Sequence, residues 1–158
     1  MQIRAEDPGA PDVSGLLAEH LADMHALSPA ESVHALDVEL LRAPGIAFVA
    51  ARDQRGVLLA VGALAELDAR HGELKSMRTA AAARGRGVGA AVLAHLVAEA
   101  RLRGYRRVSL ETGTHAYFDS AHRLYTRAGF APCPPFGDSV EDPHSRFFTL
   151  ALAPSLSP

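Results

Sequence analysis

A short segment rich in glycine and arginine, Arg84–Ala90, lies between a strand-like run and a helix-like run. The run at 73–79 before it has strand character, and the run at 87–102 after it repeats apolar residues at helical spacing. Glycines at such a junction let the backbone approach a ligand closely, since no Cβ stands in the way. The first turn of a helix also presents unpaired N–H groups and the positive end of the helix dipole. Because Arg84 and Arg86 add positive charge there, the segment predicts a phosphate or pyrophosphate site.

Two other phosphate-binding motifs share glycines with this segment. Gly85-x-Gly87-x-x-Ala90 satisfies the dinucleotide fingerprint, and Glu111 follows at the acidic position about 20 residues later. In a dinucleotide-binding unit the glycines follow their strand almost at once, whereas 80–83 intervene here. The chain after Glu111 is also too short for a second half-sheet, and no Gly-Lys-Ser/Thr of a Walker motif occurs. These departures disfavour a nicotinamide-nucleotide domain.

The residues around the glycines form a longer pattern. Met77-Arg-Thr-(x4)-Arg84-x-x-Gly87-x-Gly89 resembles the acetyl-CoA loop of the GNAT superfamily of N-acetyltransferases. Further on, 121–130 is similar to that family's helix and strand, written A-x-x-L-Y-x-x-x-G-F, with a strand pattern at 107–112 between the two motifs. The resemblance covers residues 45–152. The order of 73–75, 110–113 and 133–137 is similar to a branch of small bacterial members, some of which are labelled indole-acetate acetyltransferases.

The order of secondary-structure signals predicts one α+β domain over residues 1–158. Antiparallel strands come first, and one strand–helix–strand unit follows, whose right-handed crossover makes its two strands parallel. The resemblance implies the GNAT fold, a mixed and mostly antiparallel central sheet flanked by about four helices. It also implies that the sheet splays beside strand 73–79, where the pantetheine arm lies. The strands are expected at 2–5, 46–51, 57–67, 73–79, 107–112, from Phe130 and at 146–152, and the helices at 12–26, 30–41, 87–102 and 118–128.

The resemblance implies an enzyme that moves an acetyl group from acetyl-CoA to a primary amine of a small molecule or peptide. The amine attacks directly in a ternary complex. Main-chain groups of Met77 and Thr79 would bond the pantetheine as an added strand would. Asp119 stands where many members carry an Asn that bonds the cofactor arm; an Asp cannot donate there, and a helix cap is the alternative. The residues expected to bind acetyl-CoA are Met77, Arg78, Thr79, Arg84, Gly85, Arg86, Gly87, Val88, Gly89, Ala90 and Asp119.

Two side chains are candidates for the proton transfers. Tyr125 is the candidate acid, because a phenol with a pKa of about 10 is protonated at neutral pH and can donate to a departing thiolate. The alternative is a tyrosine packed in the core. Glu73 is the candidate base, acting through water as in some family members; the alternative is a solvated charge at a strand end, paired with Lys75 or Arg78. Strand alternation would place Glu73, Lys75, Met77 and Thr79 on one face.

The sequence constrains the identity of the acceptor and the alternative functions less than it constrains the acetyl-CoA site. His34, Asp37 and the loop 133–138 are candidates for lining an acceptor pocket, or are surface loops. Cys133 is a poor acyl-carrying nucleophile, because no histidine lies near it in sequence. A non-catalytic acyl-CoA-binding sensor is the alternative to an enzyme, although it would need neither Tyr125 nor Glu73. Family members are often dimers, so a homodimer stays open.

Composition excludes some classes of protein. A net charge of −2 gives no basic footprint for nucleic acid. No apolar run approaches about 18 residues, and the start of the chain lacks the basic-then-apolar order of a signal peptide. The 8 histidines show no metal-ligand spacing, so no metal is expected. A single cysteine suits a reducing cytoplasm, which is the predicted location.

Overall fold

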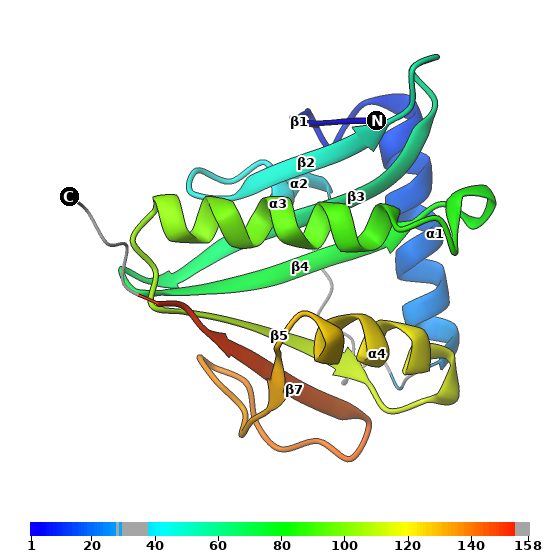
Figure 1. The fold of residues 1–158 in the computed structure, drawn as a ribbon. Coiled ribbons are helices and arrows are strands. Elements are labelled where there is room, and N and C mark those ends of the chain that lie inside the picture. Colours follow the sequence, from blue (N-terminus) through cyan, green and yellow to red (C-terminus); the bar gives the residue numbers. More distant parts are fainter. Residues whose placement is uncertain (28, 30–37, 154–158) are drawn as a thin grey trace.

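The computed structural model describes residues 1–27, 29 and 38–153. Its strands form one seven-stranded sheet in the order β1-β2-β3-β4-β5-β7-β6 (Figure 1). Every neighbouring pair is antiparallel except β4 and β5, which are parallel. The mixed, mostly antiparallel sheet of the GNAT fold is therefore confirmed. The strands are β1 Gln2–Ala5, β2 Ala47–Arg52, β3 Leu58–Asp68, β4 His71–Thr79, β5 Arg107–Gly113, β6 Ala131–Pro132 and β7 Ser145–Ala151.

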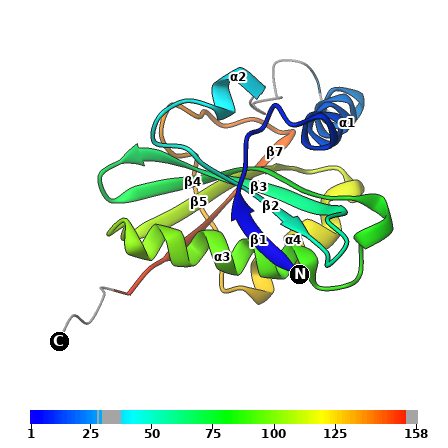
Figure 2. The ribbon, with the colours of Figure 1, turned by 90° about the horizontal axis from the view of Figure 1, so that it is seen from above.

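Helices cover both faces of this sheet. Figure 2 shows α1 and α2 on one face and α3 and α4 on the other. The predicted helix 30–41 is described only from residue 38 onward, so His34 and Asp37 lie outside the described residues. None of the described helices is long and apolar enough to cross a membrane. The helices are α1 Pro11–Leu27, α2 Val38–Leu41, α3 Val88–Leu102 and α4 Asp119–Arg127, with short 3₁₀ helices at Ala81–Ala83 and Ala116–Phe118.

Each face of the sheet has its own apolar core. On the α3 face, Val92 and Leu96 are fully buried against strand residues that include Leu64 and Leu110. Full burial of each such side chain stabilises the fold by about 1.5–3 kcal/mol. On the α1 face, the buried residues of α1 all come from its first half: Val13, Leu16 and Leu17. The second half of α1 therefore contributes no buried residue to this core.

The sheet opens between its two parallel strands. β4 and β5 are paired from His71↔Arg107 to Leu74↔Leu110 and no further. Beyond Leu74, β4 continues beside β3, while β5 continues beside β7 (Figure 1). This separation confirms the splay that the family resemblance implied, and it leaves one backbone edge of β4 without a strand partner on that side.

A bulge in β4 overturns one expectation about its side chains. Ser76 has φ +56°, and the register with β3 shifts between Val61↔Arg78 and Ala63↔Lys75. The extra residue resets the alternation of faces. Met77 consequently packs in the α3 core, whereas Arg78 reaches α1, where it pairs with Glu19. The expected common face for Glu73, Lys75, Met77 and Thr79 was wrong, because simple alternation does not survive a bulge.

Candidate active site

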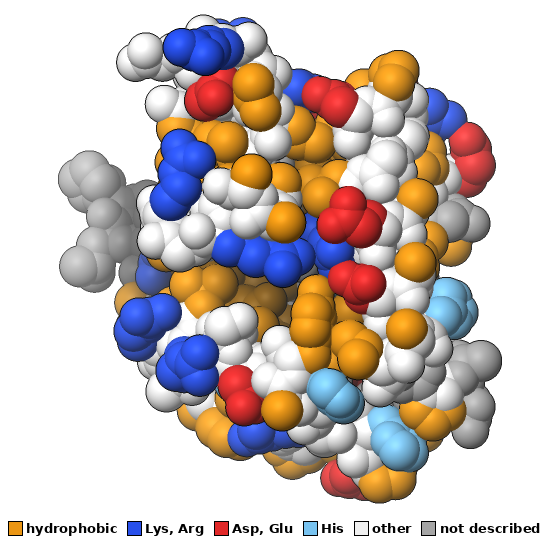
Figure 3. Space-filling view, turned by 90° about the vertical axis from the view of Figure 1, so that its right-hand side faces the viewer, with side chains coloured by type: hydrophobic (Ala, Val, Ile, Leu, Met, Phe, Trp, Pro, Cys, Tyr) orange, Lys and Arg blue, Asp and Glu red, His pale blue; other side chains and the backbone are white. Residues whose placement is uncertain are grey.

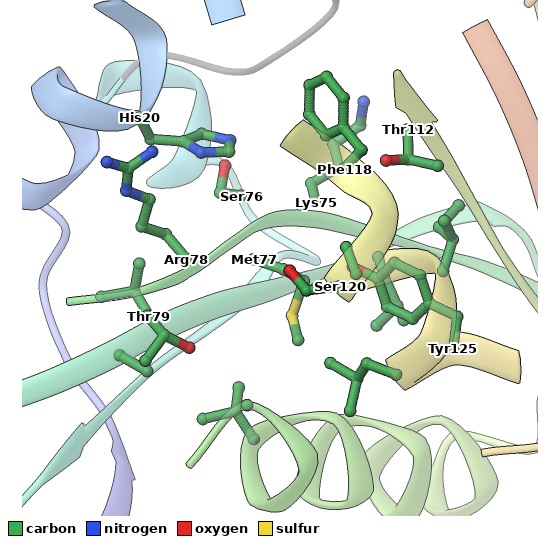
Figure 4. A pocket seen from close by; sticks show the side chains of 18 of the residues that line it. His20, Lys75, Ser76, Met77, Arg78, Thr79, Thr112, Phe118, Ser120 and Tyr125 are labelled. Carbon is green, nitrogen blue, oxygen red and sulfur yellow. The ribbon is translucent and has the colours of Figure 1, made fainter. Parts of the chain in front are cut away.

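A cleft of about 670 Å³ opens at the splay between β4 and β5. Its walls come from the second half of α1, the end of β4, the glycine-rich loop, the end of β5 and the start of α4. Figure 3 shows this face of the molecule, with basic side chains gathered in and beside a hollow and acidic side chains along one rim. Figure 4 shows side chains from these elements converging on the same space.

The glycine-rich loop forms one end of the cleft. Gly85 and Gly87 have φ of +75° and +78°, a left-handed conformation that residues with a Cβ rarely adopt. Gly87 is the N-cap of α3, and the first bond of that helix runs from the Ala91 N–H to the Gly87 carbonyl. The N–H groups of Val88, Gly89 and Ala90 precede that bond, so they have no acceptor within the helix. They supply donors at the positive end of the helix dipole.

The two arginines of the loop take different directions. Arg84 lines the cleft, and its Nε donates to the Thr79 carbonyl at 3.4 Å. Arg86 instead lines a separate depression with Arg55 and Asp53 on the other side of the loop. Arg86 was predicted to bind acetyl-CoA, but it does not line the main cleft.

The β4 segment presents its backbone to the cleft. Met77 and Thr79 both line it, while their side chains turn toward α3: Met77 joins the α3 core, and the Thr79 hydroxyl lies next to Gly89. The edge of β4 that faces β5 is unpaired beyond Leu74. An extended amide-containing arm can therefore bond to this edge as an added strand does.

Tyr125 reaches the cleft from α4. Its ring is buried at 6% exposure, with ring centroids 5.8 Å from Phe130 and 6.4 Å from Phe148. Among the described residues its hydroxyl makes no hydrogen bond, and burial raises the pKa of Tyr125 to about 12. The ring is packed in the core and Tyr125 also lines the cleft, and its role as the acid stays a prediction.

Glu73 and Lys75 form an ion pair in the cleft wall. The Lys75 Nζ lies 3.3 Å from a Glu73 carboxylate oxygen, and the two side chains are only 18% and 11% exposed. Glu73 is therefore not the solvated strand-end charge of the alternative reading, although it does pair with Lys75. Across the splay, the Ser145 hydroxyl donates to Glu111 at 2.7 Å, and both of these residues also line the cleft.

Arg78 ties three elements together beside the cleft. Its buried guanidinium lies 2.7 Å from carboxylate oxygens of both Glu19 and Asp23 on α1. It also donates to the Tyr117 hydroxyl at 3.3 Å, and that hydroxyl donates to Asp23 at 3.2 Å. The Arg78 side chain thus holds α1 against β4 and the 3₁₀ helix, and its charge is committed to protein carboxylates.

Several cleft residues differ from the predicted ones. Asp119 does not line the cleft; its side chain is 59% exposed, and Phe118 rather than Asp119 is the N-cap of α4. Ser120 and Arg127 line the cleft instead. The positive charge of Arg127, two residues after the candidate acid Tyr125, was the sequence signal that could have identified it. The loop 133–138 is absent from the cleft lining; Phe136 packs edge-on against Phe147.

Cys133 and the histidines contribute no separate reactive centre within the described part of the chain. Cys133 is half-buried, and burial raises the pKa of its thiol, which disfavours the reactive thiolate. No group of three or more His, Cys, Asp or Glu side chains among residues 1–27, 29 and 38–153 is placed to hold a metal ion.

These features together define a class of protein. A free strand edge, helix N–H donors beyond it and a protonated hydroxyl between them suit a thioester on a long amide-containing arm with a pyrophosphate, as in acyl-CoA. The model of the acetyltransferase (GNAT) family matches residues 14–130, and the chain belongs to this family. It is an acetyl-CoA-dependent N-acetyltransferase.

Relatives of similar length support this assignment. The chain is 49% identical over 152 residues to the "uncharacterized N-acetyltransferase YsnE" of Bacillus subtilis, covering 96% of this chain and 100% of the relative. It is 47% identical to the "uncharacterized N-acetyltransferase YedL" of Escherichia coli, covering 95% and 94%. It is 37% identical to a protein of Azospirillum brasilense named "IAA acetyltransferase", covering 95% and 97%.

Solved structures share the fold. A putative acyl-CoA N-acyltransferase from Klebsiella pneumoniae aligns with a TM-score of 0.80 at 27% identity, covering 96% of this chain and 97% of that one. An aminoglycoside 6′-N-acetyltransferase complexed with coenzyme A aligns with a TM-score of 0.69 at 16% identity, covering 99% and 100%. The second likeness concerns the fold alone.

Proposed function

We propose that the chain acetylates a primary amine of a small molecule or peptide by direct attack on acetyl-CoA in this cleft. One observation carries the proposal. The splay of β4 from β5, the glycine-rich loop and the Tyr125 hydroxyl open onto a single cleft, and Glu73 lies in its wall. The arrangement brings a donor site, an acid and a base to one space, as transfer within a ternary complex requires.

The acetyl-CoA is held mainly by backbone groups in this proposal. Its pyrophosphate accepts hydrogen bonds from the N–H groups at the start of α3, with Arg84 adding charge. Its pantetheine amides bond the free edge of β4 at Met77 and Thr79. Ser120 takes the place in the cleft wall that the sequence had assigned to Asp119. The thioester then lies at the splay, next to Tyr125.

The chemistry needs two proton transfers that involve protein side chains. Glu73 accepts the proton of the acceptor ammonium through a water molecule, which leaves a neutral amine, and later returns that proton to solvent. The amine nitrogen attacks the thioester carbonyl carbon, the new C–N bond forms and the C–S bond breaks. The nitrogen, which carries one extra proton after the attack, releases it to solvent to give the amide. Tyr125 donates its proton to the departing thiolate and regains one from solvent. Its pKa of about 12 keeps the hydroxyl protonated at neutral pH.

Thiol release from acetyl-CoA, followed with and without a panel of primary amines, tests the proposal. Amine-dependent release with stoichiometric acetylated product by mass spectrometry is the expected result. Varying both substrates should give intersecting rather than parallel reciprocal plots, because no acyl-enzyme forms. Tight CoA binding with no amine-dependent release would instead identify a non-catalytic acyl-CoA sensor.

Location and assembly are further proposals. We propose a cytoplasmic enzyme, which the lone and unpaired Cys133 and the use of acetyl-CoA support. A homodimer is proposed on the family resemblance. Cell fractionation tests the first proposal, and light scattering coupled to size exclusion tests the second.

A further inference from the structure

Among the described residues, the wall of the cleft beneath α1 holds three buried polar atoms without hydrogen-bond partners. They are His20 Nδ1, Ser76 Oγ and Arg78 Nε. Ser76 and Arg78 are each only 7% exposed, and all three side chains line the cleft. Figure 4 shows the Ser76 hydroxyl next to the His20 ring, with the Arg78 side chain alongside. Most buried polar groups in proteins are paired, so three orphans in one wall require an explanation.

Local structure directs these atoms to one place. Ser76 lies in the bulge with φ +56°, and its hydroxyl points toward the His20 ring of α1 (Figure 4). The terminal nitrogens of Arg78 are fixed by Glu19 and Asp23, which leaves the Nε–H as its unpaired donor. His20 comes from the half of α1 that does not cover the core. Two elements far apart in sequence thus contribute to a single polar patch, which we call the α1–β4 patch (His20, Ser76 and Arg78).

The chemistry of the patch favours an oxygen atom as its partner. An arginine Nε–H can only donate, and a serine hydroxyl can donate as well as accept. Burial lowers the pKa of His20 to about 4, and the Arg78 charge lowers it further than Asp23 raises it. His20 is therefore neutral at physiological pH, and the Arg78 charge beside it is already paired with Glu19 and Asp23. A carbonyl or carboxylate oxygen can accept from the Arg78 Nε–H and from the Ser76 hydroxyl, and also from His20 in the tautomer whose Nδ1 carries the proton.

The position of the patch relates this oxygen to the reacting amine. Ser76 lies three residues beyond Glu73 on β4, a span of roughly 10 Å for a strand. This span accommodates, in order, a water molecule bound to Glu73, the amine of the acceptor and two or three of the acceptor's carbon atoms. The oxygen and the amine of the acceptor are therefore separated by a few bonds.

We propose that the α1–β4 patch is the acceptor subsite for an oxygen close to the amine, an inference that rests on the proposed function. The acceptor class is then an α-amino acid or the amino terminus of a peptide, both of which carry a carbonyl group on the amine-bearing carbon. Tyr117 and Phe118, which also line the cleft, offer apolar contacts to a side chain.

Acetylation rates of three matched amines test the subsite: L-phenylalanine, L-phenylalaninamide and phenethylamine, the last of which lacks the carbonyl. The parent should prefer an α-carbonyl acceptor to phenethylamine by about tenfold or more in kcat/KM, since a buried polar site rejects a ligand that leaves it unpaired. Equal rates with the acid and the amide indicate a peptide amino terminus, whereas a preference for the acid indicates a free amino acid.

Two variants test whether the α1–β4 patch causes the preference for an α-carbonyl acceptor. Ser76→Ala should lower kcat/KM for the preferred acceptor about tenfold and for phenethylamine much less, without a lower unfolding temperature, because the hydroxyl has no hydrogen-bond partner in the described part of the chain. His20→Phe should act similarly, whereas His25→Phe, at an exposed position of the same helix, serves as the control. A parent that acetylates phenethylamine as well as phenylalanine, or variants that keep the full preference, would overturn the subsite alone. A parent that acetylates no primary amine would overturn the proposed function.

Discussion

The two ends of the cleft are built from different parts of the chain. At the loop end, the features that face the ligand are the left-handed Gly85 and Gly87, the N–H groups at the start of α3 and the free edge of β4. At the α1 end, the cleft is lined by side chains, among them the Glu73–Lys75 ion pair and the α1–β4 patch. The loop end therefore presents mainly backbone groups to the ligand, whereas the α1 end presents mainly side chains.

This difference separates what the fold specifies from what the individual sequence specifies. A backbone site persists wherever the fold persists, and the fold is shared with structures of only 16% to 27% identity. A site made of side chains changes with every substitution on α1 or β4. Recognition of acetyl-CoA therefore follows from family membership, whereas the choice of amine depends on residues such as His20 and Ser76.

The largest expected effect lies where the two ends meet, at Tyr125. Tyr125→Phe removes one oxygen that has no hydrogen bond among the described residues, so the unfolding temperature should hardly change. Loss of a positioned acid should lower kcat by about 10²–10⁴-fold while KM for acetyl-CoA holds. Steady-state kinetics and thermal unfolding measure both quantities. A normal kcat would return Tyr125 to a role in core packing.

Glu73 tests the side-chain end. Glu73→Gln keeps the shape and removes the basic oxygen, so activity should fall by about 100-fold at pH 6, where neutral amine is scarce, and less at pH 9. Lys75→Met is the matched control, since it removes the ion pair but not the base. Equal losses in the two variants across this pH range would make Glu73 a structural charge.

Gly87 tests the backbone end. A valine at φ +78° is strained although its Cβ meets no atom, so Gly87→Val should distort the loop and weaken CoA binding by about tenfold or more. Gly104→Val, at φ +80° and equally open, imposes a similar strain at the opposite end of α3. Calorimetry should show weakened binding only for Gly87→Val. Equal affinities would place the pyrophosphate elsewhere.

The last expected effect concerns stability in acid rather than activity or cofactor binding. The pKa of His20 falls from 6.5 to about 4 on folding, so its stabilising contribution is complete above pH 6.5 and is lost as pH falls toward 4. The loss should be about 2 to 3 kcal/mol in unfolding free energy. Denaturant unfolding of His20→Phe should lack this acid-dependent part, whereas His25→Phe should retain it. An unchanged pH dependence in His20→Phe would mean that another group is responsible.

The backbone end was the more predictable of the two. The glycine spacing and the strand–helix–strand order implied the loop and α3, and the family resemblance implied the splay, because these features depend on φ angles and hydrogen-bond pairing. The faces of β4 were predicted wrongly, since a serine with positive φ leaves no signal in the sequence. The α1–β4 patch was missed for a related reason: it joins His20 to β4 across a long sequence separation, and only the packing of α1 brings them together.

A crystal structure of the protein with bound acetyl-CoA would locate each part of the cofactor. We expect the pyrophosphate at the N–H groups of Val88–Ala90, the pantetheine amides on the β4 backbone at Met77 and Thr79, and the thioester sulfur within hydrogen-bond reach of the Tyr125 hydroxyl. We also expect the space beneath α1 to stay free for the acceptor. A thioester sulfur remote from Tyr125, or a pantetheine arm that does not enter the splay, would mean that acetyl transfer does not take place in this cleft as proposed.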